Sequence, residues 1–111
     1  MPWPVMIDRL PEADLPFPPE VVIGRILRAP EGLTAFFTFH QPMTLPPQSH
    51  GAQWGVVVEG EIATTIGSET RVCRAGDSYD IPAGVEHGAK IAAGTRVIDV
   101  FEEPDRYAAR G

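Results

Sequence analysis

The most constraining feature of the chain is a run of turn residues that ends in a histidine, residues 76–87, which read G-D-S-Y-D-I-P-A-G-V-E-H. Gly76 and Asp77 form a turn dipeptide, residues 78–81 can form a short strand, and residues 82–84 turn the chain again. The spacing therefore predicts two tight turns around one short strand, with the imidazole of His87 held at the start of the next strand.

A second polar cluster lies upstream of this run. Gln48, His50 and Gln53 precede the apolar residues 54–58, and the turn Glu59-Gly60 follows them. Side chains alternate between the two faces of an extended chain, so Gln48 and His50, two residues apart, are expected to project to the same side. Gln53 can join them from the following strand. The pattern indicates a pair of imidazoles flanked by two amides.

These two segments resemble the two sequence motifs of the cupin superfamily. The second motif matches from Gly76 through Pro82 and Gly84 to His87, although its terminal Asn is absent. The first motif matches in part: Gln53 stands at the usual Glu position, His50 at the second His, and Gln48 replaces the first His. The resemblance implies an all-β domain, a double-stranded β-helix or jelly-roll barrel related to the RmlC-like cupins.

The hydrophobic pattern agrees with an all-β chain. Short apolar runs are separated by Gly-containing and Pro-containing turns every eight to twelve residues, which is typical of a sandwich or barrel. The expected strands are residues 21–27, 33–40, 54–58, 62–66, 70–74, 79–81, 88–92 and 95–101. We expect residues 1–19 to form a Pro-rich extended arm, with an edge strand near residues 5–7, and residues 41–47 to form a loop. Residues 20–111 are then one cupin domain.

Composition excludes several kinds of partner. The formal net charge is −6 and the basic residues are scattered, whereas nucleic acids and anionic membranes require a cationic surface. No apolar run is long enough to span a bilayer. The first residues lack the basic start and apolar stretch of a secretion signal, so we expect a cytoplasmic protein. The apolar arm and the number of strand faces favour a homodimer.

The expected metal site has an unusual set of ligands. His50, His87, Gln48 and Gln53 are all neutral, whereas a divalent ion usually takes at least one anionic oxygen. Two histidines with an amide oxygen can hold Zn, Ni, Fe, Mn or Cu if the geometry is rigid. The alternative is a pocket without metal, in which Gln48, His50 and His87 hydrogen-bond one another.

Four further residues are candidates for the pocket. Asp99 lies in the apolar strand V-I-D-V-F, and a carboxylate there must be solvated or paired, so it could act as a base, contact a substrate or pair with an arginine. His40 ends a strand and could face the barrel mouth or the surface. Tyr79 and Trp54 could line the pocket or pack in a core or an interface.

The sequence thus predicts a small metal-binding cupin that binds a compact anionic or carbonyl-bearing metabolite. Cupins include lyases, isomerases and oxygenases, and no motif here separates these activities. The alternative is a non-enzymatic small-molecule-binding module without tightly held metal. In both cases the expected partner is a small molecule.

Overall fold

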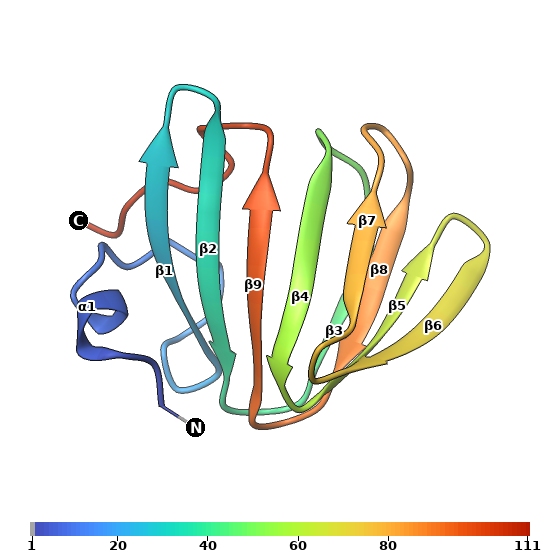
Figure 1. Cartoon of the computed structure of the whole chain (residues 1–111), viewed down its shortest axis with the longest axis horizontal. Helices are drawn as coiled ribbons and strands as arrows, with labels where there is room; N and C mark the ends of the chain where they lie inside the picture. The colour runs from blue at the N-terminus through green and yellow to red at the C-terminus, as the bar shows by residue number, and fades with distance from the viewer. Residues whose placement is uncertain (1) are drawn as a thin grey trace.

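Two antiparallel β-sheets form the protein, as a computed structural model of residues 2–111 shows. One sheet has five strands in the order β1-β2-β9-β4-β7, and the other has four in the order β3-β8-β5-β6. Their bounds are β1 Val22–Ala29, β2 Gly32–Phe39, β3 Met43–Gln48, β4 Gln53–Glu59, β5 Glu61–Ile66, β6 Glu69–Arg74, β7 Ser78–Ile81, β8 His87–Ile91 and β9 Thr95–Phe101. In Figure 1 the five-stranded sheet faces the viewer, and β3 and β8 pass behind β4 and β7.

Alternating apolar residues explain how the sheets pack. In β2, every second residue from Leu33 to Phe39 is buried and the residues between them are only partly buried. The same period of two governs β9, where Val97, Asp99 and Phe101 are buried. Because successive side chains of a strand point to opposite faces, each sheet contributes one apolar face to a shared core. The all-β jelly-roll prediction is confirmed, and each predicted strand agrees with an observed one to within two residues.

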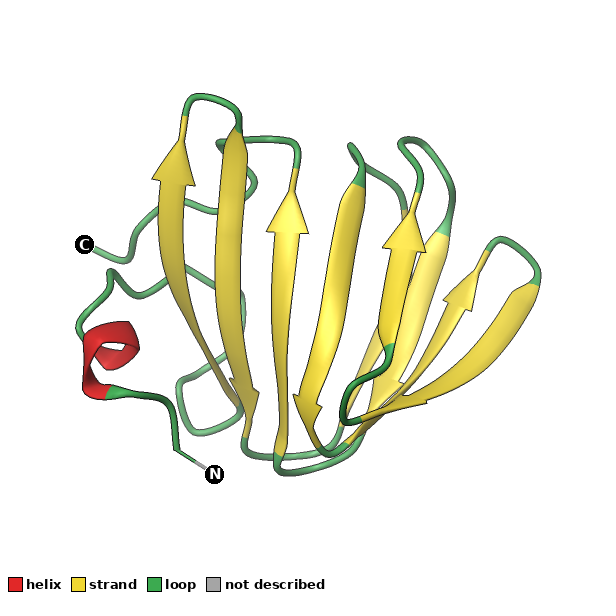
Figure 2. Ribbon diagram, in the orientation of Figure 1, coloured by secondary structure: helices red, strands yellow, loops and turns green. Residues whose placement is uncertain are grey.

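Two local predictions were wrong. Residues 41–47 were expected to be a loop, but β3 occupies Met43–Gln48 despite its two prolines. β3 is an edge strand, and an edge position tolerates proline because one side of the strand needs no ladder hydrogen bonds. The expected edge strand near residues 5–7 is instead the single helical turn α1, Val5–Asp8, the red element in Figure 2.

The two ends of the chain cover the outer edge of β1. Ala13 donates its amide to Gly24 of β1 at 2.8 Å, and Glu12 forms a bridge with Arg25. The C-terminal segment joins on the far side, where Ala13 forms a bridge with Ala109. Residues near both termini therefore extend the five-stranded sheet by isolated bridges. The edge of β1 is covered near Gly24 and Arg25.

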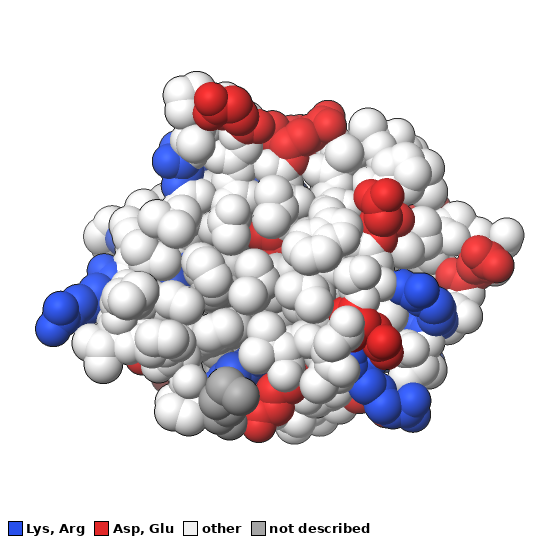
Figure 3. All heavy atoms as spheres, in the orientation of Figure 1, with Lys and Arg blue, Asp and Glu red and all other residues white. Residues whose placement is uncertain are grey.

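The outer face of the five-stranded sheet carries few charged side chains. Figure 3 shows this face, and the Asp, Glu, Lys and Arg side chains lie mainly around its margin. Among residues 2–111, no helix is long and apolar enough to cross a membrane.

Candidate functional site

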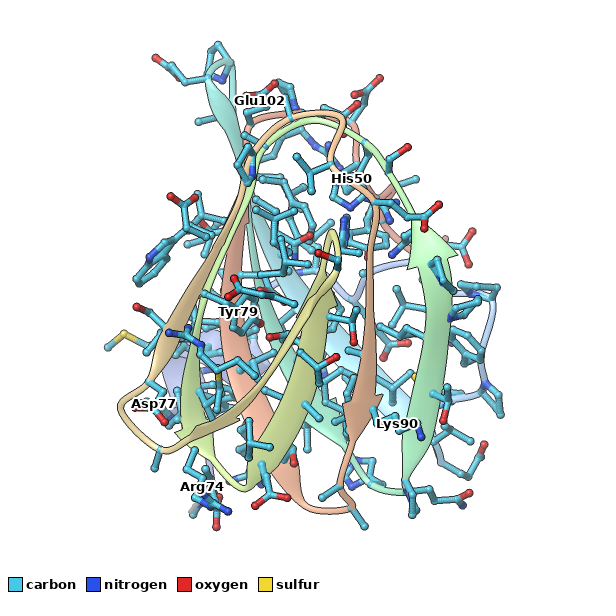
Figure 4. All side chains as sticks on the ribbon, turned by 90° about the vertical axis from the view of Figure 1, so that its right-hand side faces the viewer. His50, Arg74, Asp77, Tyr79, Lys90 and Glu102 are labelled. Carbon is cyan, nitrogen blue, oxygen red and sulfur yellow. The ribbon has the colours of Figure 1, made fainter. Side chains whose placement is uncertain are left out.

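The space between the sheets contains a small cavity where the two sequence motifs meet. Its volume is about 90 Å³, and both apolar core residues and a polar group line it. The polar lining residues are Gln48, His50, Gln53, Thr64, Tyr79, His87, Asp99, Arg106 and Tyr107. Figure 4 shows His50 near the upper end of the space between the two layers and Tyr79 further down. Arg74 and Lys90 lie towards the opposite end of the molecule in the same view.

The two histidines come from different parts of the fold and lie against each other. His87 is the first residue of β8, while His50 lies in the connection between β3 and β4, after β3 has ended at Gln48. Their ring centroids are 4.7 Å apart and the rings are almost perpendicular. Gln48 and His87 are paired across β3 and β8, beyond a register shift that follows Leu45. The irregular end of β3 thus places Gln48 and His50 of the first motif beside His87 of the second.

Backbone carbonyls fix the tautomer of both rings. Nδ1 of His50 is 2.8 Å from the carbonyl oxygen of Gly51, and Nδ1 of His87 is 3.0 Å from that of Val85. A carbonyl can only accept a hydrogen bond, so each Nδ1 carries the proton and each Nε2 keeps its lone pair. A ring held in this way is oriented as a metal-ligating histidine is in known sites.

Nε2 of His87 is the most informative atom of the site. It is buried and has no hydrogen-bond partner among the described residues. Leaving a buried polar atom unpaired costs about 1–3 kcal/mol, so such an atom needs an explanation. A bound metal ion is one, because it would take up this lone pair together with that of His50. The donor set therefore fits a divalent ion, although residues 2–111 contain no group of three or more His, Cys, Asp and Glu side chains that could hold one.

Burial favours the neutral form of His50. Burial has the largest effect and lowers the pKa of His50; the hydrogen bond to Gly51 comes next and raises it, and the nearby positive charge of Arg106 lowers it again. The carboxylate of Glu103, 3.8 Å from Nδ1 of His50, also opposes the decrease, and Glu103 accepts a hydrogen bond from the Gly51 amide. A neutral imidazole is the form that binds a metal.

Asp99 and Tyr79 form a buried hydrogen-bonded pair in the cavity wall. The Tyr79 hydroxyl donates to Asp99 Oδ1 at 2.6 Å, and the side chain of Gln53 also hydrogen-bonds this carboxyl group. Burial raises the pKa of Asp99 to about 6, although both hydrogen bonds act in the opposite direction. Burial and the neighbouring Asp99 raise the pKa of Tyr79, so the phenol stays protonated. Asp99 can therefore gain or lose a proton near neutral pH.

Gly55 creates the room for this pair. It is the Cα partner of Tyr79 on β7 and of Asp99 on β9, so all three residues share one row of the five-stranded sheet. A Cβ atom at position 55 would collide with Asp99 Oδ1 and with the Tyr79 ring. The missing side chain of β4 is thus what lets the phenol reach the carboxylate.

Two candidates from the sequence do not reach the cavity. Trp54 precedes the inward-facing Gly55 and so points out of the sheet, where it is 43% exposed. His40 follows the last residue of β2, is exposed, and borders a surface hollow that Trp3 also lines. The cavity thus brings together Gln48, His50, Gln53, Tyr79, His87 and Asp99, and leaves His40 and Trp54 outside.

Sequence reasoning missed Arg106 and Tyr107. The segment that follows β9 turns back over the cavity, and the Arg106 guanidinium lies 4.6 Å from the Tyr107 ring centroid and 5.7 Å from that of Phe101. Its Nε is buried without a hydrogen-bond partner in the described part of the chain. The only signal in the sequence was an Arg-Tyr pair soon after the last strand, and it has no periodicity that places it at the cavity.

Comparisons with known proteins agree with the fold. The family model described as "Cupin domain" matches residues 38–101. The solved structure of KdgF from Halomonas sp. is 26% identical, covers 86% of each chain and has a TM-score of 0.72. An RmlC-like cupin from Shewanella frigidimarina is 27% identical, covers 89% of this chain and 87% of its own, and has a TM-score of 0.76. No curated protein matches the chain.

Proposed function

Because the chain belongs to the cupin superfamily, we propose that it is a small metal-binding cupin that binds a compact anionic or carbonyl-bearing metabolite and acts on it as a lyase, isomerase or oxygenase. The observation that carries this proposal is the buried Nε2 of His87, which has no hydrogen-bond partner among the described residues and belongs to a ring packed against that of His50. Two oriented imidazoles in one cavity are the core of a transition-metal site.

In this proposal His50 and His87 supply the strong ligands. Gln53 and Gln48, which line the same cavity, supply amide oxygens. The ion would be divalent Zn, Ni, Fe, Mn or Cu, which all accept imidazole nitrogen. When bound, it would polarise a carbonyl or carboxylate oxygen of the metabolite and acidify a bound water. All four ligands are neutral and offset none of the positive charge of the ion, which favours an anionic metabolite.

Arg106 supports the same class of metabolite. It is the one Lys or Arg among the residues that line the cavity. The guanidinium fork matches a carboxylate better than a lysine does, and aromatic rings of Tyr107 and Phe101 hold it in place. The volume of about 90 Å³ leaves space for a small molecule only.

Asp99 is the residue we assign to proton transfer. Its pKa of about 6 makes the carboxyl group an effective acid or base near neutral pH. Tyr79 donates to one oxygen at 2.6 Å and so orients the carboxyl group. Asp99 would accept or return a proton on a metabolite that Arg106 holds in the cavity.

The second candidate is a ligand-binding module without tightly held metal. One observation favours it: the described residues contain no group of three or more His, Cys, Asp and Glu side chains placed to hold an ion. In that case Arg106 and the polar cavity wall bind the small molecule alone.

Metal content separates the two candidates. Protein purified without chelator should contain about one equivalent of a transition metal, and His50→Ala and His87→Ala should each reduce it at least about tenfold, because each removes one of two imidazoles. His40→Ala is the matched control, since this histidine lies outside the cavity. Metal-free wild type that takes up no ion on titration would favour the module.

A separate titration tests the metabolite class. Pyruvate carries both a carboxylate and a carbonyl, so calorimetry with pyruvate probes both expectations. Arg106→Gln should weaken binding at least about tenfold, as expected when a charged hydrogen-bond donor is lost. Arg9→Gln, a change at an exposed arginine next to α1, should leave binding unchanged. Equal affinity of wild type and Arg106→Gln would remove Arg106 from the site.

A further inference from the structure

A hollow separate from the cavity lies between the N-terminal arm, residues 2–19, and the outer face of the five-stranded sheet. Its volume is about 160 Å³. Trp3 and Asp8 line it from the arm, while Arg25, Thr38, His40 and Arg96 line it from the strands and from the end of β2. We call it the arm hollow. None of these six residues lines the cavity that contains His50 and His87.

The strand register places one arginine on each side of β2. Arg25 of β1 is paired with Phe36 of β2, and Arg96 of β9 is paired with Thr38, two residues further along β2. The residues before and after each arginine are buried, so alternation turns both arginines away from the cavity. Two guanidinium groups from strands far apart in the sequence therefore flank β2 on the same face of the sheet.

Trp3 fixes the arm beside these arginines. Its ring packs edge-on against Phe36 with the centroids 5.6 Å apart, and its indole N–H donates to the Thr38 hydroxyl at 2.8 Å. The guanidinium carbon of Arg96 lies 6.0 Å from the centroid of the Trp3 ring. Figure 1 shows α1, which follows Trp3 in the chain, beside β1. The arm thus closes one side of the hollow with an oriented aromatic ring.

Both guanidinium groups have N–H donors that the protein does not use. Nη1 of Arg96 is 3.5 Å from Oε2 of Glu59, a long hydrogen bond, and its Nε is buried with no partner in the described part of the chain. Nη1 of Arg25 donates to the Leu10 carbonyl at 3.3 Å, and residues 2–111 supply no hydrogen-bond partner for its other N–H groups. Unpaired donors are costly on a charged group that is mostly buried, as the Arg96 side chain is at 20% exposure.

We propose that the arm hollow is a second ligand site, which binds a phosphate group. A guanidinium presents paired N–H donors that match two phosphate oxygens, so Arg25 and Arg96 can hold one phosphate from two sides. Their two positive charges match the charge of a phosphate group, about −1.5 to −2 at neutral pH, better than that of a single carboxylate. The Thr38 hydroxyl accepts the hydrogen bond of Trp3 and keeps its own hydrogen to donate.

The surrounding charge limits what can carry the phosphate. Asp8 is the one carboxylate among the described residues that line the hollow, and it is exposed. It opposes an anion but is outweighed by the two arginines. The chain as a whole has a formal net charge of −6, which repels a polyanion such as a nucleic acid. The ligand is therefore free phosphate or the phosphate monoester of a small molecule.

Calorimetric titration with inorganic phosphate tests the site. Wild type should bind with a dissociation constant of about 1 mM or tighter at about 50 mM salt, where screening is weak. Arg25→Gln and Arg96→Gln should each weaken binding at least about tenfold, because a charge-assisted pair of hydrogen bonds is lost. Asp8→Asn should bind about threefold more tightly, since an exposed like charge is removed. Arg9→Gln is the matched control: Arg9 is exposed next to α1, does not line the hollow and should not affect binding.

Two further variants separate the arm hollow from the cavity. His87→Ala and Arg106→Gln change the cavity alone, so both should bind phosphate as wild type does. Loss of phosphate binding in either variant would place the phosphate in the cavity and overturn the proposal. Wild type that binds no phosphate, acetate binding as tight as phosphate binding, or equal affinity of wild type and both arginine variants would also overturn it.

Fluorescence locates the bound phosphate. In Trp54→Phe the only remaining tryptophan is Trp3, and its emission should change with the same midpoint as the calorimetric titration. The same change at the same midpoint in Trp54→Phe with Arg96→Gln would contradict the site. Glycerol 3-phosphate in the same buffer identifies the source of the phosphate group: tighter binding than inorganic phosphate indicates a phosphate monoester, and weaker binding indicates free phosphate.

Discussion

The chemistry of the candidate site depends on where two protons lie. The carbonyl oxygens of Gly51 and Val85 hold the Nδ1 protons of His50 and His87, and so both Nε2 atoms are left as acceptors. Had either ring carried its proton on Nε2 instead, the buried atom would be a donor and would repel a cation. Backbone geometry at two loops, and not the identity of the histidines alone, therefore decides whether the pair can bind an ion.

Gln48→His is the most direct residue-scale prediction for the metal site. Gln48 lines the cavity and is paired with His87, so a histidine there would add a third imidazole. We expect divalent zinc or nickel to bind about tenfold or more tightly, because these ions prefer imidazole nitrogen to an amide oxygen. Calorimetry measures this, with Gln41→His, outside the cavity, as the control. Unaltered affinity would mean that residue 48 does not reach the ion.

Asp99 makes the folding stability depend on pH. Its pKa rises from 3.8 to about 6 on folding, so between these values the folded state keeps a proton that the unfolded state has lost. The free energy of unfolding therefore decreases as the pH rises through this window, by up to about 3 kcal/mol in total, and is level above it. Urea unfolding of metal-free wild type and Asp99→Asn at pH 4–7 measures the difference between the two curves.

The two unfolding curves should approach or cross as the pH rises to 6, because the variant has no group to ionise at this position. Asp105→Asn, a change at an exposed carboxylate after β9, should follow the wild-type curve. A constant difference between wild type and Asp99→Asn over the whole range would mean that Asp99 is as acidic in the fold as in the unfolded chain.

At the scale of the strand, β4 has neighbouring residues of very different size on its two faces. Its inward side has no side chain at Gly55, where Tyr79 and Asp99 meet, while its outward side carries Trp54. We expect Gly55→Ala to destabilise the fold by about 1–3 kcal/mol, as overpacking of a core does. Denaturant unfolding checks this. In Asp99→Ala the same change should cost less, since one of the two clashing groups is gone and the Tyr79 ring, no longer held by its hydrogen bond to Asp99, can shift; additive losses would contradict the steric explanation.

Strands and motif residues were readable from the sequence because they depend on local patterns. Alternation located β2 and β9, and the Gly and Pro turns located β7 and His87. The strand β3 was missed because its prolines indicate a loop unless the strand is known to lie at an edge. Arg106 was missed for a different reason: its position follows from how the segment after β9 folds back, which no period in the chain encodes. The outward direction of Trp54 follows from the strand register alone.

At the scale of the whole molecule, Arg110 joins the two ends of the chain. Its guanidinium pairs with Glu12 at 3.2 Å and donates to the Leu15 carbonyl at 3.2 Å, and its amide donates to the Glu12 carbonyl at 2.7 Å. Leu15 is also part of the cavity lining. The side chain of Arg110 thus contacts both the segment that covers the β1 edge and a residue of the cavity wall.

Arg110→Ala should weaken the pairing of the two terminal segments at the edge of β1, while the barrel stays folded. Only the side-chain contacts are lost, so we expect amide hydrogen exchange of Ala13 and Asp14 to become about tenfold faster, in proportion to local opening. These amides donate to Gly24 and to Ala108 at 2.8 Å, and both bonds need the termini in place. Amides in β9 serve as the internal control and should exchange as in wild type, because β9 lies inside the sheet between β2 and β4. Unchanged exchange at Ala13 would show that the backbone bridges hold the edge without the guanidinium. Faster exchange throughout β9 would show that the ends stabilise the whole sheet and not its edge alone.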